Sequence, residues 1–279
     1  MLIHEMPMDV YRNAEGVSAS DLKNMQRSPA YARLRPSVKS DALEWGTAVH
    51  TAVLEPETLT NRYRIDPMSP KGGYPAGWRN SNDYKTQRGQ LLAEPGVLGL
   101  MTAVEFDALE RIAENVATNE IGAKLHDLAG TRESSLFVTD SEFNTRRKCR
   151  PDWLIPSARM IVDVKTAQDW RPQAFARACY RYGYHMTAAY YIDTFALDWT
   201  VEVEHYVFLV VASDAPHEVA AYTLDRDSVE QGRSDYRKAL AEWTRCKASD
   251  AWPCGLAKIE EIRIPEFGIN YHNEMEDAF

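Results

Sequence analysis

Cysteine is scarce in this sequence, and its copies never occur in close pairs. The four cysteines, Cys149, Cys179, Cys246 and Cys254, are scattered, and no CxxC motif is present. Disulfide-rich folds and cysteine-based metal sites need cysteines at short, regular spacings. The sequence therefore argues against a disulfide framework and against a zinc or iron–sulfur site.

Long apolar runs are also missing. No window approaches the uninterrupted hydrophobic stretch that a membrane-spanning helix needs. The first residues, Met1 to Met6, carry neither the basic nor the apolar region of a secretory signal. We therefore expect a protein that makes no membrane contact and is cytoplasmic.

Basic residues are outnumbered by acidic ones, 32 against 41, which gives a net charge of −9. Proteins that bind nucleic acid with their whole surface are usually basic, so that class is disfavoured. A local basic channel stays compatible with this balance. Basic residues gather at positions 146–150 and at Arg171, Arg177 and Arg181, although such clusters are more often solvated surface than DNA contacts.

The most informative stretch runs from Arg150 to Thr166. Two apolar runs, 153–155 and 160–162, are joined by a Pro-Ser-Ala-Arg turn, which predicts a β-hairpin. Asp163 and Lys165 are two apart on the second strand and therefore share one face. Asp152 lies on the neighbouring strand and can reach the same place. Two carboxylates beside a lysine can hold a divalent cation and steady an attacking water.

An Asp-x-Lys pattern alone is more often a surface ion pair than a catalytic site. Its context makes it more specific. Pro151-Asp152, then an apolar hairpin, then Asp163-Val164-Lys165 resembles the PD-(D/E)xK nuclease signature.

The predicted fold is α/β: a mixed central β-sheet flanked by helices, with a mostly helical N-terminal part. With 279 residues, the chain can bury one large core, and we expect a single nuclease domain over 1–279. Residues 1–17 are expected to be a poorly structured arm, and residues 56–90 a long loop rich in Pro, Gly and Asn. The predicted parts are 1–130 (helices at 18–28, 30–34, 41–55 and two in 101–129), 131–247 as catalytic core (strands 133–139, 146–155, 159–165, 202–212 and 218–224; helices 170–182, 184–197 and 225–247) and the tail 248–279.

Three further signals accompany the motif. Gly46 and His50 lie one turn apart on a predicted helix, where the alternatives are a packing glycine and a satisfied core histidine. Glu133 begins the first predicted strand of the core. The run from Tyr184 to Tyr191 lies on a later helix.

In order and content, these signals resemble the RecB-type branch of the PD-(D/E)xK superfamily. The opening Ser18-Ala19-Ser20-Asp21-Leu22-Lys23 with Ser28-Pro29, and the run from Gly46 to Pro56, look like phage and prophage RecE-type exonucleases, the exonuclease VIII nuclease domain. Lambda exonuclease is a more distant relative. The resemblance covers roughly residues 18–255.

The resemblance implies a site for Mg²⁺ or Mn²⁺. His50, Asp152, Asp163 and the backbone carbonyl of Val164 would bind the metal, and oxygen-rich ligands of this kind suit both ions. Lys165 would orient and help to activate the attacking water. Glu133 would lie near a second metal or its waters.

The resemblance also implies DNA contacts. Ser28 and Arg33 are candidates for the terminal 5′-phosphate, although a serine at a helix end is more often a cap. Arg150, Thr187 and Tyr191 are further candidates. Thr187 departs from the family, which usually has Gln there with Tyr four residues later, and His185 or Gln173 could compensate.

The implied activity is a Mg²⁺-dependent 5′→3′ double-strand DNA exonuclease that leaves 3′ single-stranded overhangs for phage-type recombination. Its partners would be duplex DNA ends, a single-strand annealing protein of the RecT type and further copies of itself in a trimeric or tetrameric ring. Two alternatives are another PD-(D/E)xK nuclease, such as an endonuclease or a Cas4-like enzyme, and a catalytically weakened DNA-end-binding protein. The absence of a cysteine cluster disfavours the Cas4-like alternative, and metal-dependent cleavage would separate an enzyme from a binding protein.

Overall fold

A five-stranded mixed sheet forms the centre of the molecule in the computed structural model, which describes residues 1–34, 40–69, 71–198, 201–255 and 259–263. Strand β8 pairs in parallel with β9 and antiparallel with β7, while β10 and β4 form the two edges. The strands are β4 (Thr131–Arg132), β7 (Trp153–Ile155), β8 (Met160–Ala167), β9 (His205–Ala212) and β10 (Val219–Thr223).

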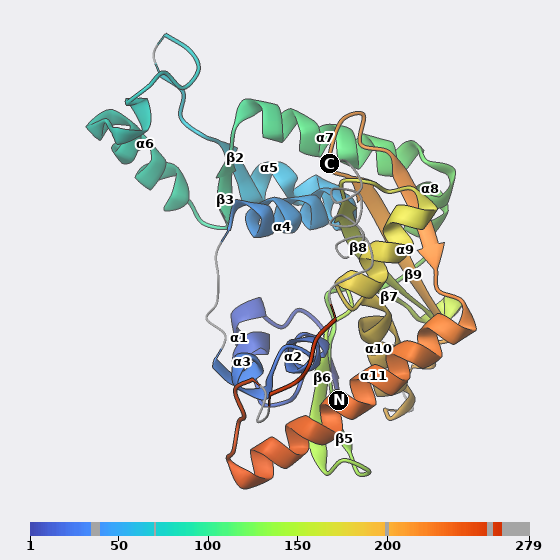
Figure 1. The fold of residues 1–279 in the computed structure, drawn as a ribbon. Coiled ribbons are helices and arrows are strands. Elements are labelled where there is room, and N and C mark those ends of the chain that lie inside the picture. The colour runs from blue at the N-terminus through green and yellow to red at the C-terminus, as the bar shows by residue number, and fades with distance from the viewer. Residues whose placement is uncertain (35–39, 70, 199–200, 256–258, 264–279) are drawn as a thin grey trace, which may run out of the picture.

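Strands β8 and β9 are buried on both faces of the sheet, which their apolar, β-branched sequences favour. Alternate residues feed two cores: Ile161 and Phe208 point to one, Val162 and Leu209 to the other. Figure 1 shows the helices arranged on both sides of the sheet. One side carries α2 (Ala19–Met25), α9 (Pro172–Arg181), α10 (Tyr184–Ala196) and α11 (Arg226–Ser249); the other carries α4 (Asp41–Leu54), α7 (Ala103–Thr118) and α8 (Glu120–His126).

The expected strand over 146–155 is wrong in one respect, because it is two strands in two different sheets. The first is β6 (Thr145–Cys149), and the chain leaves it at Arg150-Pro151 before entering β7. Proline has no N–H to continue a ladder, which explains the break. The three-stranded sheet that contains β6 has the order β1 (Leu2–Ile3), β5 (Ser135–Asp140), β6.

The N-terminal segment is not a poorly structured arm, so that expectation is also wrong. It forms β1 and the helix α1 (Met8–Asn13), and the ring of Tyr11 is buried. The Lys148 ammonium of β6 donates to three carbonyls at the end of α1, those of Tyr11 (3.2 Å), Arg12 (3.1 Å) and Ala14 (2.7 Å). These partners come from distant sequence, so local patterns do not reveal them.

Residues 56–90 are not one long loop. The segment contains short helices and a strand, and the helix α6 lies away from the rest of the molecule in Figure 1. The buried carboxylate of Asp66 connects η2 and α6 to the chain after β2. It accepts hydrogen bonds from Tyr84 Oη (3.0 Å), Arg79 Nη2 (3.2 Å) and Arg88 Nη1 (3.4 Å). The elements here are η1 (Pro56–Thr58), α5 (Leu59–Arg62), β2 (Tyr63–Ile65), η2 (Trp78–Asn80), α6 (Asn82–Leu92) and β3 (Gly99–Met101), which pairs in parallel with β2.

Most other predicted elements are confirmed with small shifts at their ends. Ser18 and Asp21 form the capping box that begins α2, and a short helix α3 (Pro29–Leu34) follows. The turn of the β7–β8 hairpin is the 3₁₀ turn η3 (Pro156–Ala158). Within the described residues, no helix is long and apolar enough to cross a bilayer. Residues 264–279 of the predicted tail lie outside the described part.

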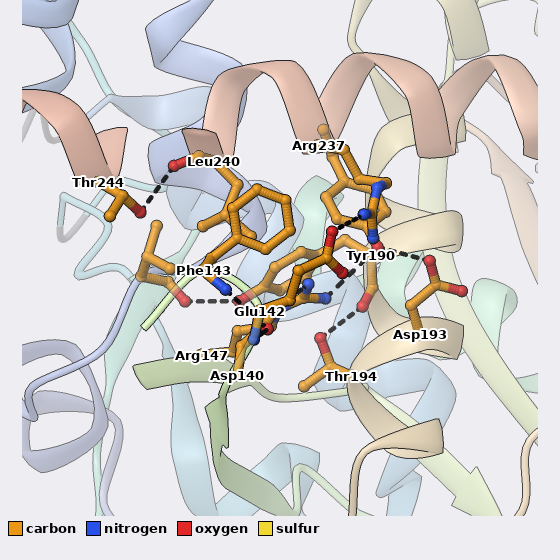
Figure 2. Close-up of polar contacts among 12 residues, drawn as sticks. Asp140, Glu142, Phe143, Arg147, Tyr190, Asp193, Thr194, Arg237, Leu240 and Thr244 are labelled. Carbon is orange, nitrogen blue, oxygen red and sulfur yellow. Dashed lines mark hydrogen bonds and ion pairs between the residues drawn. The ribbon is translucent and has the colours of Figure 1, made fainter. Parts of the chain in front are cut away.

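A buried polar network joins the β5–β6 hairpin to α10 and α11 (Figure 2). Arg147 of β6 forms an ion pair with Asp140 of β5 and donates to Tyr236 Oη at 3.4 Å. Tyr236 in turn donates to Asp193 Oδ2 at 2.5 Å, and Arg233 donates to both oxygens of Asp193 at 2.8 Å. Strand β6 ends three residues before Asp152. By holding β6 in place, this network also positions Asp152, one of the candidate catalytic carboxylates.

Two helical glycines should respond in opposite ways to alanine. A Cβ at Gly232 of α11 would lie 2.2 Å from the His185 carbonyl oxygen of α10, whereas at Gly46 of α4 it would meet nothing within 4 Å. We expect Gly232→Ala to lower the free energy of unfolding by about 1–3 kcal/mol. Gly46→Ala should raise it by about 0.5–1 kcal/mol. Denaturant unfolding measures both, and similar shifts in the two variants would contradict the packing described here.

Candidate functional site

The hairpin β7–β8 brings the three motif side chains together. Lys165 Nζ lies 2.5 Å from Asp163 Oδ2 and donates to the Val164 carbonyl at 3.1 Å. The Val164 N–H donates to Asp152 Oδ2 at 2.8 Å, which fixes the carboxylate of Asp152 against β8. The expectation that Asp152, on the neighbouring strand segment, reaches the same place as Asp163 and Lys165 is therefore met.

His50 reaches this group from α4. Its Nδ1 lies 3.6 Å from Asp152 Oδ1, and 30% of its side chain is exposed. His50 is thus neither a buried core histidine nor remote from the carboxylates. A Cβ at Gly46, one turn earlier, would meet nothing within 4 Å, so close packing does not require a glycine there and the alternative of a packing glycine is wrong.

The charged side chains of the site shift the pKa values of Asp152 and Lys165. Burial raises the pKa of Asp152, and Asp163 raises it further, while His50 and Lys165 act in the opposite direction. Burial lowers the pKa of Lys165, but Asp163 and Asp152 outweigh this effect, so that its pKa is raised overall. Lys165 is therefore a cation at neutral pH. It is suited to stabilise negative charge and to orient water, and not to act as a general base.

The donors of the site fit a hard cation. Asp163 Oδ2 is buried, and its ion pair with Lys165 places a positive charge beside it. The same ammonium also contacts the Val164 carbonyl, so two of the predicted metal ligands already face a cation. Oxygen donors of this kind suit a hard divalent cation. Among the described residues, no three His, Cys, Asp or Glu side chains lie close enough together to hold a metal, so the ligand set of His50, Asp152, Asp163 and the Val164 carbonyl stays a prediction.

Glu133 lies beside Asp152 in a cleft of about 360 Å³. The Glu133 N–H donates to the Asp152 carbonyl at 3.0 Å, and the Glu133 carboxylate pairs with Arg150 Nη2 at 2.8 Å. Tyr191 of α10 also lines the cleft and donates to the Arg150 carbonyl at 3.2 Å. The structure therefore brings together these four predicted residues in one cleft.

The opposite wall of the cleft was missed by the sequence reasoning. It is formed by residues of α1 and of the start of α2, which was expected to follow a loose arm. No local pattern indicates it, because Lys148 is a buried lysine in the basic strand 145–149, where Arg146 is exposed, and its partners are known only from the fold. The wall residues are Met8, Tyr11, Arg12, Ser18, Ala19, Ser20 and Asp21.

The Arg150 guanidinium is largely satisfied within the protein. It donates to the Met6 carbonyl (2.6 Å) and to Ser135 Oγ (3.0 Å), besides its pair with Glu133, and its side chain is 8% exposed. This arrangement holds the N-terminal segment against the cleft. A contact of Arg150 with DNA remains a prediction.

Thr187, where the resemblance predicts Gln, makes its hydrogen bond within its own helix and not with the carboxylates. Its hydroxyl donates to the Gly183 carbonyl of its own helix at 3.3 Å, and the residue is buried. His185 is engaged elsewhere, with the Cys179 carbonyl (3.1 Å) and Asp235 (3.3 Å). The residue of this helix that meets Lys165 is Tyr184, whose ring centre lies 5.2 Å from Nζ. Sequence reasoning missed it by looking only for a hydrogen-bonding side chain.

Ser28 and Arg33 have contacts away from the carboxylates. Ser28 Oγ accepts from the Tyr31 N–H at 3.1 Å, which is the capping role weighed above. Arg33 forms an ion pair with Asp250 and lies over the ring of Trp252. Their contact with a 5′-phosphate remains a prediction.

Residues 18–265 match the model of a family described as a PDDEXK-like domain of unknown function (DUF3799). The chain belongs to this family. The predicted PD-(D/E)xK membership and the predicted α/β fold with a mixed sheet flanked by helices are confirmed. The PD-(D/E)xK fold is typical of nucleases, and Asp152, Asp163 and Lys165 supply the side chains of its motif.

Solved structures are similar in fold. A candidate exonuclease from Eubacterium rectale superimposes with a TM-score of 0.59 at 14% identity, over 95% of this chain and 98% of that one. A phage-related exonuclease from Haemophilus somnus 129PT gives a TM-score of 0.35 at 12% identity, over 87% of this chain and 100% of that one. A comparison with curated proteins finds no match.

Proposed function

We propose that this protein is a divalent-metal-dependent exonuclease that degrades duplex DNA from its ends in the 5′→3′ direction and leaves 3′ single-stranded overhangs. The observation that carries the proposal is the contact of Asp152, Asp163 and Lys165 within a PDDEXK-like fold. The proposal extends to a ring of three or four copies and to a RecT-type annealing protein as partner in recombination.

Each residue has a role in hydrolysis that follows from its surroundings. Asp152, Asp163, the Val164 carbonyl and His50 would hold Mg²⁺ or Mn²⁺. When bound, the ion would polarise the scissile phosphate and lower the pKa of water. Lys165, held cationic by the two carboxylates, donates to the attacking water and offsets the negative charge that develops on the phosphate.

Glu133 adds a carboxylate on the other side of Asp152, where its pairing with Arg150 fixes its position. The cleft that it lines is bounded by residues of α1 and of the start of α2. The name of the Eubacterium rectale relative supports the choice of an exonuclease over an endonuclease.

The test is digestion of a linear duplex that is 5′-phosphorylated at one end only, beside covalently closed circular DNA, with Mg²⁺ or with EDTA. We expect loss of the phosphorylated strand from its 5′ end, only on linear DNA and only with metal. Lys165→Ala should remove this activity, whereas Lys124→Ala, which changes an exposed lysine paired with Glu120, should retain it.

Each other outcome has a definite meaning. Cutting of the circle would replace the exonuclease proposal with an endonuclease. Absence of cutting with both Mg²⁺ and Mn²⁺ would favour a DNA-end-binding protein, and the Thr187 departure would then be the main clue.

A further inference from the structure

Two tyrosines stand out at the turn between α9 and α10. Tyr180 is 76% exposed and Tyr182 is 53% exposed. Within the described residues, no other Phe, Tyr or Trp side chain is as exposed. The two uncovered rings lie two residues apart and form a small aromatic surface that is available for binding.

This aromatic turn leads directly to the candidate catalytic lysine. The ring of Tyr182 lies 5.7 Å from that of Tyr184, centre to centre. The Tyr184 ring in turn has Lys165 Nζ at 5.2 Å from its centre and Lys23 Nζ at 5.8 Å. A line of rings therefore runs from the solvent to Lys165.

The backbone holds the turn in a defined shape. Gly183 has φ +65°, a left-handed conformation that favours glycine, and a Cβ there would lie 2.8 Å from Lys23 Cδ. Tyr180 stacks on His185, with ring centres 5.7 Å apart and planes at 23°. Both exposed rings are thus presented by a fixed support.

The charge around the turn differs from that of the chain as a whole. From Trp170 to Ile192 the sequence contains no Asp or Glu and, besides Arg171, which pairs with Asp169, the two basic residues Arg177 and Arg181, in a chain of net charge −9. The Arg181 guanidinium lies 5.6 Å from the centre of the Tyr182 ring. Asp235, which contacts His185 behind Tyr180, is the carboxylate that approaches this surface from α11.

We propose that Tyr180 and Tyr182 are a stacking platform for the unpaired bases of the DNA strand that passes Lys165. The proposal rests on the proposed nuclease function and names how that site holds its substrate. Aromatic rings beside basic groups bind single strands in a sequence-tolerant way, because every base has a π-face that can stack. The basic local charge favours a nucleic acid over a second copy of this acidic chain as the occupant.

The test is the affinity for a short, fluorescently labelled oligothymidylate, measured by anisotropy in EDTA so that no cleavage occurs. The double variant Tyr180→Ala/Tyr182→Ala should raise the Kd about tenfold or more, and the double Phe variant should bind like the wild type. Val104→Ala, which changes an exposed apolar residue of α7, serves as the control and should leave the Kd unchanged. The salt dependence should be the same in wild type and Ala variant, since stacking releases no counterions.

Several results would overturn the proposal. These are an unchanged Kd in the Ala variant, an equal loss in the Phe variant, or no binding of the oligothymidylate by the wild type. If the Ala variant changed its oligomeric mass but not its Kd, the two rings would instead form a contact with a second copy of the chain.

The proposal and the nuclease function can fail separately. If the wild type cleaves no DNA but the Ala variant loses oligothymidylate affinity, the platform stands and the nuclease function fails. If DNA is cleaved and the Kd is unchanged in the Ala variant, only the platform fails.

Discussion

Asp163→Asn should lower the rate of DNA cleavage by about 10²- to 10⁴-fold, and Asp163→Ala should abolish cleavage. The substitution removes the charge that would hold the cation, whose contribution to charge stabilisation is several kcal/mol. It also releases Lys165 from the carboxylate 2.5 Å away, so the lysine is no longer fixed for water. Single-turnover cleavage of a linear duplex measures the loss.

The fold should survive this change. Asp163 is one of the groups that raise the pKa of the buried Asp152, so its removal relieves repulsion between two carboxylates. The control is Asp169→Asn, an exposed carboxylate that pairs with Arg171 outside the site and should leave the rate unchanged. Retained turnover in the folded Asp163→Ala variant would remove Asp163 from the site.

Arg147→Met should lower the free energy of unfolding by about 3–5 kcal/mol, the usual loss when one partner of a buried ion pair is removed. The Arg147 and Asp140 side chains are 2% and 3% exposed, so the substitution leaves a buried carboxylate without its partner. The hydrogen bond to Tyr236 is lost as well. Urea unfolding, followed by circular dichroism, measures the change.

The same hairpin offers a matched control. Arg237 pairs with Glu142 of the β5–β6 turn, but these side chains are 38% and 60% exposed (Figure 2). Arg237→Met should therefore cost no more than about 1 kcal/mol. Equal losses in the two variants would contradict the view that the buried pair anchors the hairpin.

The central motif could be predicted from the sequence because its signals are local. Period-two alternation placed Asp163 and Lys165 on one face of β8, and the Pro-Ser turn predicted the pairing of β7 with β8. The predicted helices from 18 and from 184 begin at the capping box of Ser18 and after the left-handed Gly183, so local chemistry sets these helix ends as well.

What could not be predicted depends on contacts between distant residues. Leu2 pairs with Leu136, and Lys148 binds the carbonyls at the end of α1, so the N-terminal wall of the cleft exists only in the folded chain. Helix α6 has few apolar residues and is anchored through Asp66, which hides it from a search for hydrophobic periodicity. Tyr184 was missed because its contact with Lys165 is made by a ring and follows no hydrogen-bonding pattern.

The central claim is that Asp152, Asp163, His50 and the Val164 carbonyl hold a divalent cation beside Lys165. Calorimetric titration of Mn²⁺ into the protein without DNA tests it most directly. The account predicts binding by the wild type and by Asp169→Asn, and at least about tenfold weaker binding by Asp163→Asn. Equal Mn²⁺ affinity in the wild type and in Asp163→Asn, or no binding by the wild type, would contradict it.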